Sequence, residues 1–296
     1  MNLFRAVVRV SVIGGLLAAA DVAFTPTRTR PALDRLLTRN PETTGFMRHA
    51  AAAGHPVRDW TWVGLDSIAP VAVCAVMAAE DPTFFDHGAL DWEAQRALAR
   101  DLVHLDFSRG YSDIPQQLAR NLFLSPSRTV SRKAKEYLLA FELTHAVPKD
   151  RQLELYLNVA EWGDGVWGIE AASRHYFGVP SSALTPAQSV VLATMLVAPR
   201  RERTYMLGAR VVPRHEMVSR KLWASRLLST QEYGALVDRL RIWREYARTH
   251  DDDIRSGFVY AASIMGPESF ALVASHEPTA RLPLARYCNL SRRGYW

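Results

Sequence analysis

The stretch at residues 71–81, VAVCAVMAAED, decides how the fold is interpreted. It is an unbroken run of small and apolar residues followed directly by two acids, Glu80 and Asp81. A helix that is apolar on every side is normally buried, so we expect the acidic end of this one at the floor of a site. A carboxylate at such a position is partly removed from water, which suits it to general-acid or general-base chemistry.

The residues after this run also allow a plainer interpretation. Asp81 and Asp86 could simply cap or flank helices, and His87 could be a hydrogen-bonding side chain of the core. Glu80 is harder to explain in this way, because no Lys or Arg lies within ten residues of it in either direction. Glu80 is therefore the stronger candidate for chemistry.

Helical periodicity continues on both sides of this segment, whereas strict two-residue alternation is scarce. The pattern predicts a mainly α protein. We expect one short helix near residues 31–39 and further helices over residues 90–105, 114–123, 131–146, 151–159, 169–177, 186–197, 213–228 and 230–248.

Composition limits the class of protein. The 296 residues are 48% hydrophobic and 22% charged, which is enough for a buried core and roughly two domains. Lys and Arg number 36 against 30 Asp and Glu, and the resulting net charge of +6 favours a polyanionic partner. Two cysteines, Cys74 and Cys288, exclude a disulfide-dense scaffold and a Cys-rich zinc site. No HExxH motif is present, so the sequence requires no cofactor and leaves a divalent cation as an open question.

The amino terminus indicates a membrane. Arg5 and Arg9 precede an apolar run over residues 10–20, which Asp21 interrupts and residues 22–24 resume. The run is short for a spanning helix, and it also fits a signal peptide cleaved near residues 18–20 or a buried first helix. We expect an uncleaved anchor over residues 1–24, a juxtamembrane connector over 25–60, the main domain over 61–248, and an extension of unknown role over 249–296.

A second concentration of charge lies between residues 120 and 136. The guanidinium groups of arginine and the ammonium groups of lysine can together neutralise a diphosphate without a metal ion. A solvated helix face is the plainer alternative, and nucleic acid is not expected, because the aromatic residues needed for base stacking are absent here. The stretch contains one acidic residue, Glu136, and five basic residues: Arg120, Arg128, Arg132, Lys133 and Lys135.

The residues just before this stretch predict a helix start. Residues 110–118, GYSDIPQQL, combine a glycine loop with Ser112 and Asp113 as candidate caps and Pro115 in the first helical turn. The first-turn amides of such a helix offer a further anion site.

Four sequence motifs follow one another between residues 80 and 178. The first three consist of Glu80, Asp81, Phe84, His87 and Asp91; of Gly110, Ser112, Ile114, Gln116, Gln117, Leu118, Arg120 and Asn121; and of Arg132, Lys133 and Glu136. The fourth covers residues 156–172 and 176–178, from YLNVAEWGDGVWGIEAA to YFG. In this order the motifs resemble those of glycosyltransferase family 51, and the chain resembles the monofunctional biosynthetic peptidoglycan transglycosylases of that family.

The second motif departs from the family pattern. Tyr111, Asp113 and Pro115 replace small residues and threonines, and Arg120 replaces a lysine. Asp113 could place a negative charge near a bound pyrophosphate, or it could serve as a helix N-cap; Pro115 favours the cap. We therefore expect Asp113→Thr to cost a little stability and leave activity unchanged.

The resemblance implies a mainly α, lysozyme-like transglycosylase domain behind an N-terminal membrane anchor. Its activity would be polymerisation of lipid-linked disaccharide (lipid II) into β-1,4 glycan strands, with release of polyprenyl pyrophosphate. The resemblance also implies that Glu80 and Glu136 are the catalytic carboxylates, with Glu80 as the base. The residues expected to bind substrate are Asp81, Phe84, His87, Ser112, Gln116, Gln117, Arg120, Asn121, Arg128, Arg132 and Lys133.

The implied partners are lipid II, the growing glycan strand, the membrane, and proteins of cell division or cell-wall synthesis. The implied location is the bacterial inner membrane, with a single span and the catalytic domain on the periplasmic side. Two alternatives stay open: a lytic hydrolase of lysozyme-like fold, and a degenerate member that binds the precursor or scaffolds synthesis without catalysis.

Overall fold

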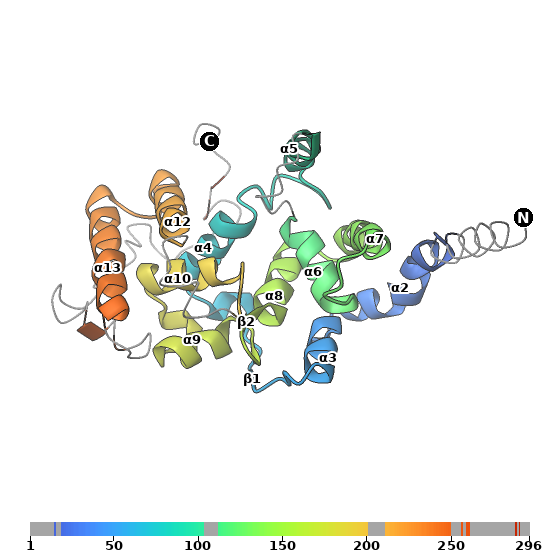
Figure 1. Ribbon diagram of the computed structural model, residues 1–296, viewed down its shortest axis with the longest axis horizontal. Helices are drawn as coiled ribbons and strands as arrows, with labels where there is room; N and C mark the ends of the chain where they lie inside the picture. The colour runs from blue at the N-terminus through green and yellow to red at the C-terminus, as the bar shows by residue number, and fades with distance from the viewer. Residues whose placement is uncertain are drawn as a thin grey trace, which may run out of the picture. The chain divides into compact units, whose positions relative to one another are not determined.

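The computed structural model describes residue 15, residues 19–103, 112–200 and 211–249, and residues 256, 259, 260, 288 and 290. Two compact units make up the chain. Unit 1 comprises Met1–Pro56 and His87–Leu155, and unit 2 comprises Val57–Asp86 and Tyr156–Trp296. Helices account for most of the described part of each unit, as the periodicity predicts (Figure 1).

Unit 1 is built around α6 (Ile114–Phe123) and α7 (Val130–Ala146), which pack against each other. α2 (Thr25–Arg35) packs on α7, and α3 (Gly45–Ala52) packs on α6. α5 (Trp92–Val103) belongs to this unit, and α8 (Lys149–Val159) begins in it and ends in unit 2. The fully buried apolar core of unit 1 includes Leu33, Ile114, Leu118, Leu139 and Leu143.

The connector predicted over residues 25–60 contains more helix than expected. The sequence predicts one short helix near residues 31–39, but α2 starts earlier and contains Pro31, and α3 follows it. The ion pair of Arg30 with Glu142 connects α2 to α7, and Asp21, just before the connector, pairs with Lys135 of α7. Prolines and charges interrupt the apolar pattern here, and for that reason the periodicity understated the helices.

Unit 2 is built around α4 (Pro70–Glu80), the helix predicted from the apolar run. Every side chain from Val71 to Ala78 is buried, which confirms that prediction. α10 (Pro186–Met195) and α12 (Val212–Ala224) pack on α4. α13 (Thr230–Thr249) lies beside α12 (Figure 1). A capping box fixes the start of α10, because Thr185 accepts from the Gln188 N–H and the Gln188 side chain accepts from the Thr185 N–H.

A small sheet in unit 2 was not predicted. Its strand order is β1 (Asp59–Trp60), β3 (Val166–Trp167), β2 (Glu161–Gly163); β1 and β3 are parallel, and β3 and β2 are antiparallel. Strands of two or three residues are too short to show an alternating pattern. α9 (Ile169–Phe177) follows β3, and the 3-10 helices η1 (Leu65–Ser67) and η2 (Ser181–Ala183) lie in connecting segments.

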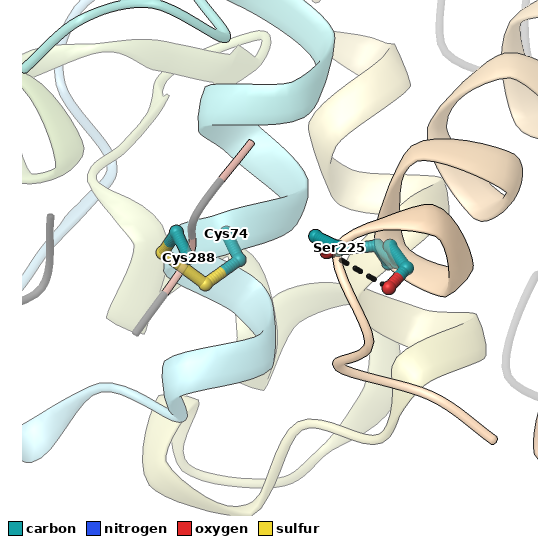
Figure 2. The surroundings of a disulfide bond; sticks show 4 residues. Cys74, Ser225 and Cys288 are labelled. Atoms are coloured by element: carbon teal, nitrogen blue, oxygen red, sulfur yellow. Dashed lines mark hydrogen bonds between the residues drawn. A yellow bond between two sulfur atoms is a disulfide. The ribbon is translucent and has the colours of Figure 1, made fainter. Parts of the chain in front are cut away.

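A disulfide bond joins α4 to the C-terminal part of the chain. Cys74 and Cys288 are both fully buried, and their Cα atoms lie 5.3 Å apart across a sequence separation of 214 residues. In Figure 2 the Cys74 side chain points from α4 to Cys288, and Ser225, just after α12, donates a hydrogen bond to the Leu222 carbonyl. The sequence excluded a disulfide-dense scaffold but did not predict this bond.

The predicted membrane anchor lies mostly outside the described residues, since residues 1–14 and 16–18 are not among them. Within the part of the chain that is described, no helix has both the length and the apolar character needed to cross a bilayer.

Candidate active site

Glu80 is the last residue of α4 in unit 2, and its side chain is only 11% exposed. Arg214, from the first turns of α12, donates a hydrogen bond from Nη2 to Glu80 Oε1 at 2.8 Å. The sequence neighbourhood of Glu80 contains no cation, so this partner comes from a segment 134 residues further along the chain. The Nε atom of Arg214 is buried and has no acceptor among the described residues.

Lys221 brings a second cation from α12 to the end of α4. Its Nζ donates to the Ala78 carbonyl at 3.0 Å, one of the last carbonyls of α4 and therefore one without a partner inside that helix. Burial lowers the pKa of Lys221 to about 8; the nearby positive charge of Arg214 acts in the same direction, and Asp81 opposes it. Arg214 and Lys221 are seven residues apart, so they lie on the same face of α12.

The other predicted residues near Glu80 differ in how accessible they are. Asp81 is buried and follows α4 directly, and its N–H donates to the Met77 carbonyl. Phe84 is fully buried and packs edge-to-face on Phe85, with ring centroids 5.0 Å apart. The structure therefore places the Phe84 side chain in the core. His87 belongs to unit 1, and its Nδ1 lies 3.0 Å from the Gly88 carbonyl oxygen.

Glu136 is the centre of a charge network in unit 1. Its side chain is 0% exposed, and it forms ion pairs with Arg132 and Lys133 from the same helix. The Ser112 hydroxyl also donates to Glu136 Oε1, at 3.4 Å. A buried carboxylate needs such partners, because an unpaired charge in the interior is strongly unfavourable. The predicted residues Ser112, Arg132, Lys133 and Glu136 are thus brought together.

Lys133 uses its full donor capacity inside this network. Its Nζ donates to Ser112 Oγ at 3.0 Å, to Gln116 Oε1 at 2.9 Å and to Glu136 Oε1 at 2.5 Å. An ammonium group has three N–H donors, so each of them has a protein acceptor. Lys133 therefore connects the start of α6 to α7.

Asp113 occupies the N-cap position of α6, as predicted, but its side chain makes no capping hydrogen bond. Its buried Oδ2 atom instead accepts from the Asp91 N–H at 2.9 Å and from Gln116 Nε2 at 3.0 Å. Asp113 therefore connects the segment before α5 to the first turn of α6. This role corrects the expectation that Asp113 is a simple helix cap, because its Oδ2 atom bonds to Asp91 and Gln116 and its side chain makes no cap hydrogen bond.

The remaining predicted cations do not form one face. Arg128 is exposed and precedes α7, whereas the charge of Lys135 is paired with Asp21. The guanidinium of Arg120 lies over the Phe46 ring of α3, 5.6 Å from its centroid, and Asn121 is buried. Gln117 donates to the Ser112 carbonyl at 2.9 Å. Among the described residues, Lys135 is therefore the one of these cations whose charge is balanced by an acid from outside the stretch.

Two arginines of unit 1 keep an unused donor. The Nε atoms of Arg120 and Arg132 are buried and have no acceptor among the described residues. Buried donors in proteins almost always have an acceptor, so such atoms need an explanation.

Sequence reasoning missed Arg214 and Lys221. Their seven-residue spacing on a predicted helix was a usable signal, but nothing local connected that helix to Glu80. The structure therefore places the predicted residues in two clusters, one around Glu80 in unit 2 and one around Glu136 in unit 1. A largely buried carboxylate at a helix end and a network of cations are features found at enzyme active sites.

Comparison with known proteins identifies the family. The chain matches the family model described as Transglycosylase over residues 49–222. It is 43% identical over 195 residues to a Biosynthetic peptidoglycan transglycosylase from Azoarcus sp. (strain BH72), covering 63% of this chain and 84% of that protein. A protein of the same name from Laribacter hongkongensis (strain HLHK9) is 40% identical over 189 residues, with 62% and 83% covered.

Another protein of that name, from Rhizobium leguminosarum bv. trifolii (strain WSM2304), is 48% identical over 141 residues, which is 48% of this chain and 60% of the relative. The protein described here therefore belongs to the transglycosylase family, as its motifs predict.

Proposed function

We propose that this protein is a peptidoglycan glycosyltransferase that polymerises lipid II into β-1,4 glycan strands and releases polyprenyl pyrophosphate. Family membership and the names of the relatives support this activity. The observation that carries it is the network of Arg132 and Lys133 around the buried Glu136. A neutral glycan would not need such a network, whereas a pyrophosphate leaving group would be stabilised by it.

In the proposed reaction the 4-hydroxyl of the acceptor sugar attacks the anomeric carbon of the growing chain. The bond from that carbon to the pyrophosphate oxygen breaks, and its electron pair leaves with the pyrophosphate. Glu80 takes the hydroxyl proton as the new bond forms. Displacement of an α-linked phosphate in this way inverts the configuration and gives a β-1,4 linkage. The position of Glu80 at the end of a buried apolar helix supports its role as the base.

The leaving group would be bound by the guanidinium groups of Arg120 and Arg132, whose Nε–H groups have no acceptor among the described residues. Lys133 would add charge without a direct bond, because its three donors already have acceptors. Glu136 would then act by orienting Arg132 and Lys133 rather than by taking a proton.

We further propose that the domain works on the periplasmic side of the inner membrane behind an anchor at residues 1–24. Arg5 and Arg9 before the apolar run support the orientation, since positive charge stays on the cytoplasmic side. The Cys74–Cys288 disulfide supports it as well, because such bonds persist in oxidising compartments. A lipid-tethered substrate must also be met at a bilayer surface.

Turnover of labelled lipid II by the purified full-length chain tests the proposal. We expect glycan polymer from the wild type and a loss of several orders of magnitude in Glu80→Gln, which keeps the shape of the side chain and removes the base. Glu42→Gln, an exposed glutamate with the same chemical change, is the matched control and should behave as wild type. Wild-type turnover in Glu80→Gln would reject Glu80 as the base. Release of fragments from purified cell wall without lipid II would instead favour a lytic, lysozyme-like enzyme.

A further inference from the structure

Arg214 of α12 supplies a counter-charge to Glu80. Arg214 Nη2 lies 2.8 Å from Glu80 Oε1, a normal length for a charge-assisted hydrogen bond. The side chains are 28% and 11% exposed, respectively, so water screens this pair less than it screens a surface ion pair.

The packing of α12 on α4 keeps the two partners in place. His215, Val218, Ser219 and Leu222 are buried along α12, and Lys221 is bonded to the Ala78 carbonyl of α4. Arg214 and Lys221 therefore contact the last turn of α4 from two points on one helix. The packing of α12 on α4 therefore keeps the Arg214 backbone close to the last turn of α4.

Arginine is suited to orienting a base without competing with it. The guanidinium stays protonated throughout the accessible pH range, so it cannot take the proton that Glu80 receives. Its planar group of donors also fixes a direction, which a point charge does not. Loss of the correct placement of a catalytic group can lower the reaction rate about 100-fold.

We propose that Arg214 is the positioning residue of Glu80: its Nη2–H holds Oε1 so that the carboxylate is aligned for the acceptor hydroxyl. This inference rests on the proposed role of Glu80 as the base. It assigns a function in catalysis to α12, whose charged residues lie outside the motifs that carried the family resemblance.

The test is steady-state kinetics of the full-length chain with labelled lipid II. Arg214→Met keeps the length of the side chain and removes its charge and donors; we expect kcat to fall about 100-fold with KM changed less than about threefold. Arg214→Lys restores a charged donor and should recover part of kcat. Arg220→Met is the matched control, because Arg220 is an exposed arginine of the same helix, and it should retain wild-type kcat.

The outcomes separate this inference from the proposed function. If Glu80→Gln retains activity, the assignment of the base is wrong. If Glu80→Gln is inactive and Arg214→Met has wild-type kcat, the base stands and the positioning role is rejected. A purely structural ion pair would lower the melting temperature of Arg214→Met and leave kcat per folded molecule unchanged, which would also overturn the inference. If Arg214→Met fails to fold, the Arg214→Lys variant decides the question: kcat below wild type at unchanged KM supports positioning, and wild-type kcat opposes it.

Discussion

Removal of the Cys74–Cys288 bond should destabilise unit 2 by an amount that follows from its position in the chain. The bond closes a loop with a sequence separation of 214 residues. In the chain-entropy description, a cross-link of this span removes about 18 cal/mol/K from the unfolded state, or about 5 kcal/mol at 25 °C. Native disulfides of this kind typically contribute about 2–5 kcal/mol, so we expect a loss in that range.

Urea unfolding with and without reductant measures this loss. Cys288→Ala is the preferred variant, because it removes the cross-link while the buried Cys74 side chain keeps its packing within α4. Its unfolding free energy should equal that of the reduced wild type and should not respond to reductant. If thiol titration shows both cysteines free in the reduced wild type and the urea midpoint is unchanged, the reasoning from loop closure is refuted.

Two further predictions concern buried polar groups. Asp113→Thr should lower the free energy of unfolding by about 1–3 kcal/mol, because the Asp91 N–H and Gln116 lose a buried acceptor. Asp113→Asn keeps an acceptor oxygen and should lower that free energy less. Equal urea midpoints for the wild type and both variants would contradict this. The pKa of Lys221 is lowered from 10.5 to about 8, so between these pH values the folded protein binds fewer protons than the unfolded chain. Stability should therefore rise by up to about 3 kcal/mol between pH 8 and 10.5, and a rise of the same size in Lys221→Met would show that another group is responsible.

Local patterns predicted the helices well. The bounds of α6 and α9 agree with the predicted ranges 114–123 and 169–177, and the apolar run at residues 71–79 forms the buried helix α4. Periodicity succeeds here because it reports which face of a helix is buried. Periodicity does not show which other helix packs against the buried face. For this reason α12 was predicted as a helix, but its contact with Glu80 was not.

The parts of the site that escaped prediction depend on distant partners. The bond from Arg214 to Glu80 spans 134 residues, and the disulfide from Cys74 to Cys288 spans 214. Asp113 shows a subtler limit, because its N-cap position was predicted correctly while its hydrogen bonds go to other partners. A short side chain at a helix start can bond to its own backbone or to a neighbouring segment, and only the tertiary structure decides between them.

The buried network of Arg132, Lys133 and Glu136 also restricts the order in which these residues can be substituted. Replacing Glu136 first would leave Arg132 and Lys133 as two uncompensated like charges on one helix. Loss of one partner of a buried ion pair typically costs about 3–5 kcal/mol, whereas joint replacement by apolar residues of similar size is often neutral. The three residues should therefore show strong non-additivity in combinatorial libraries. Stepwise substitution at these positions would therefore pass through less stable intermediates than simultaneous substitution.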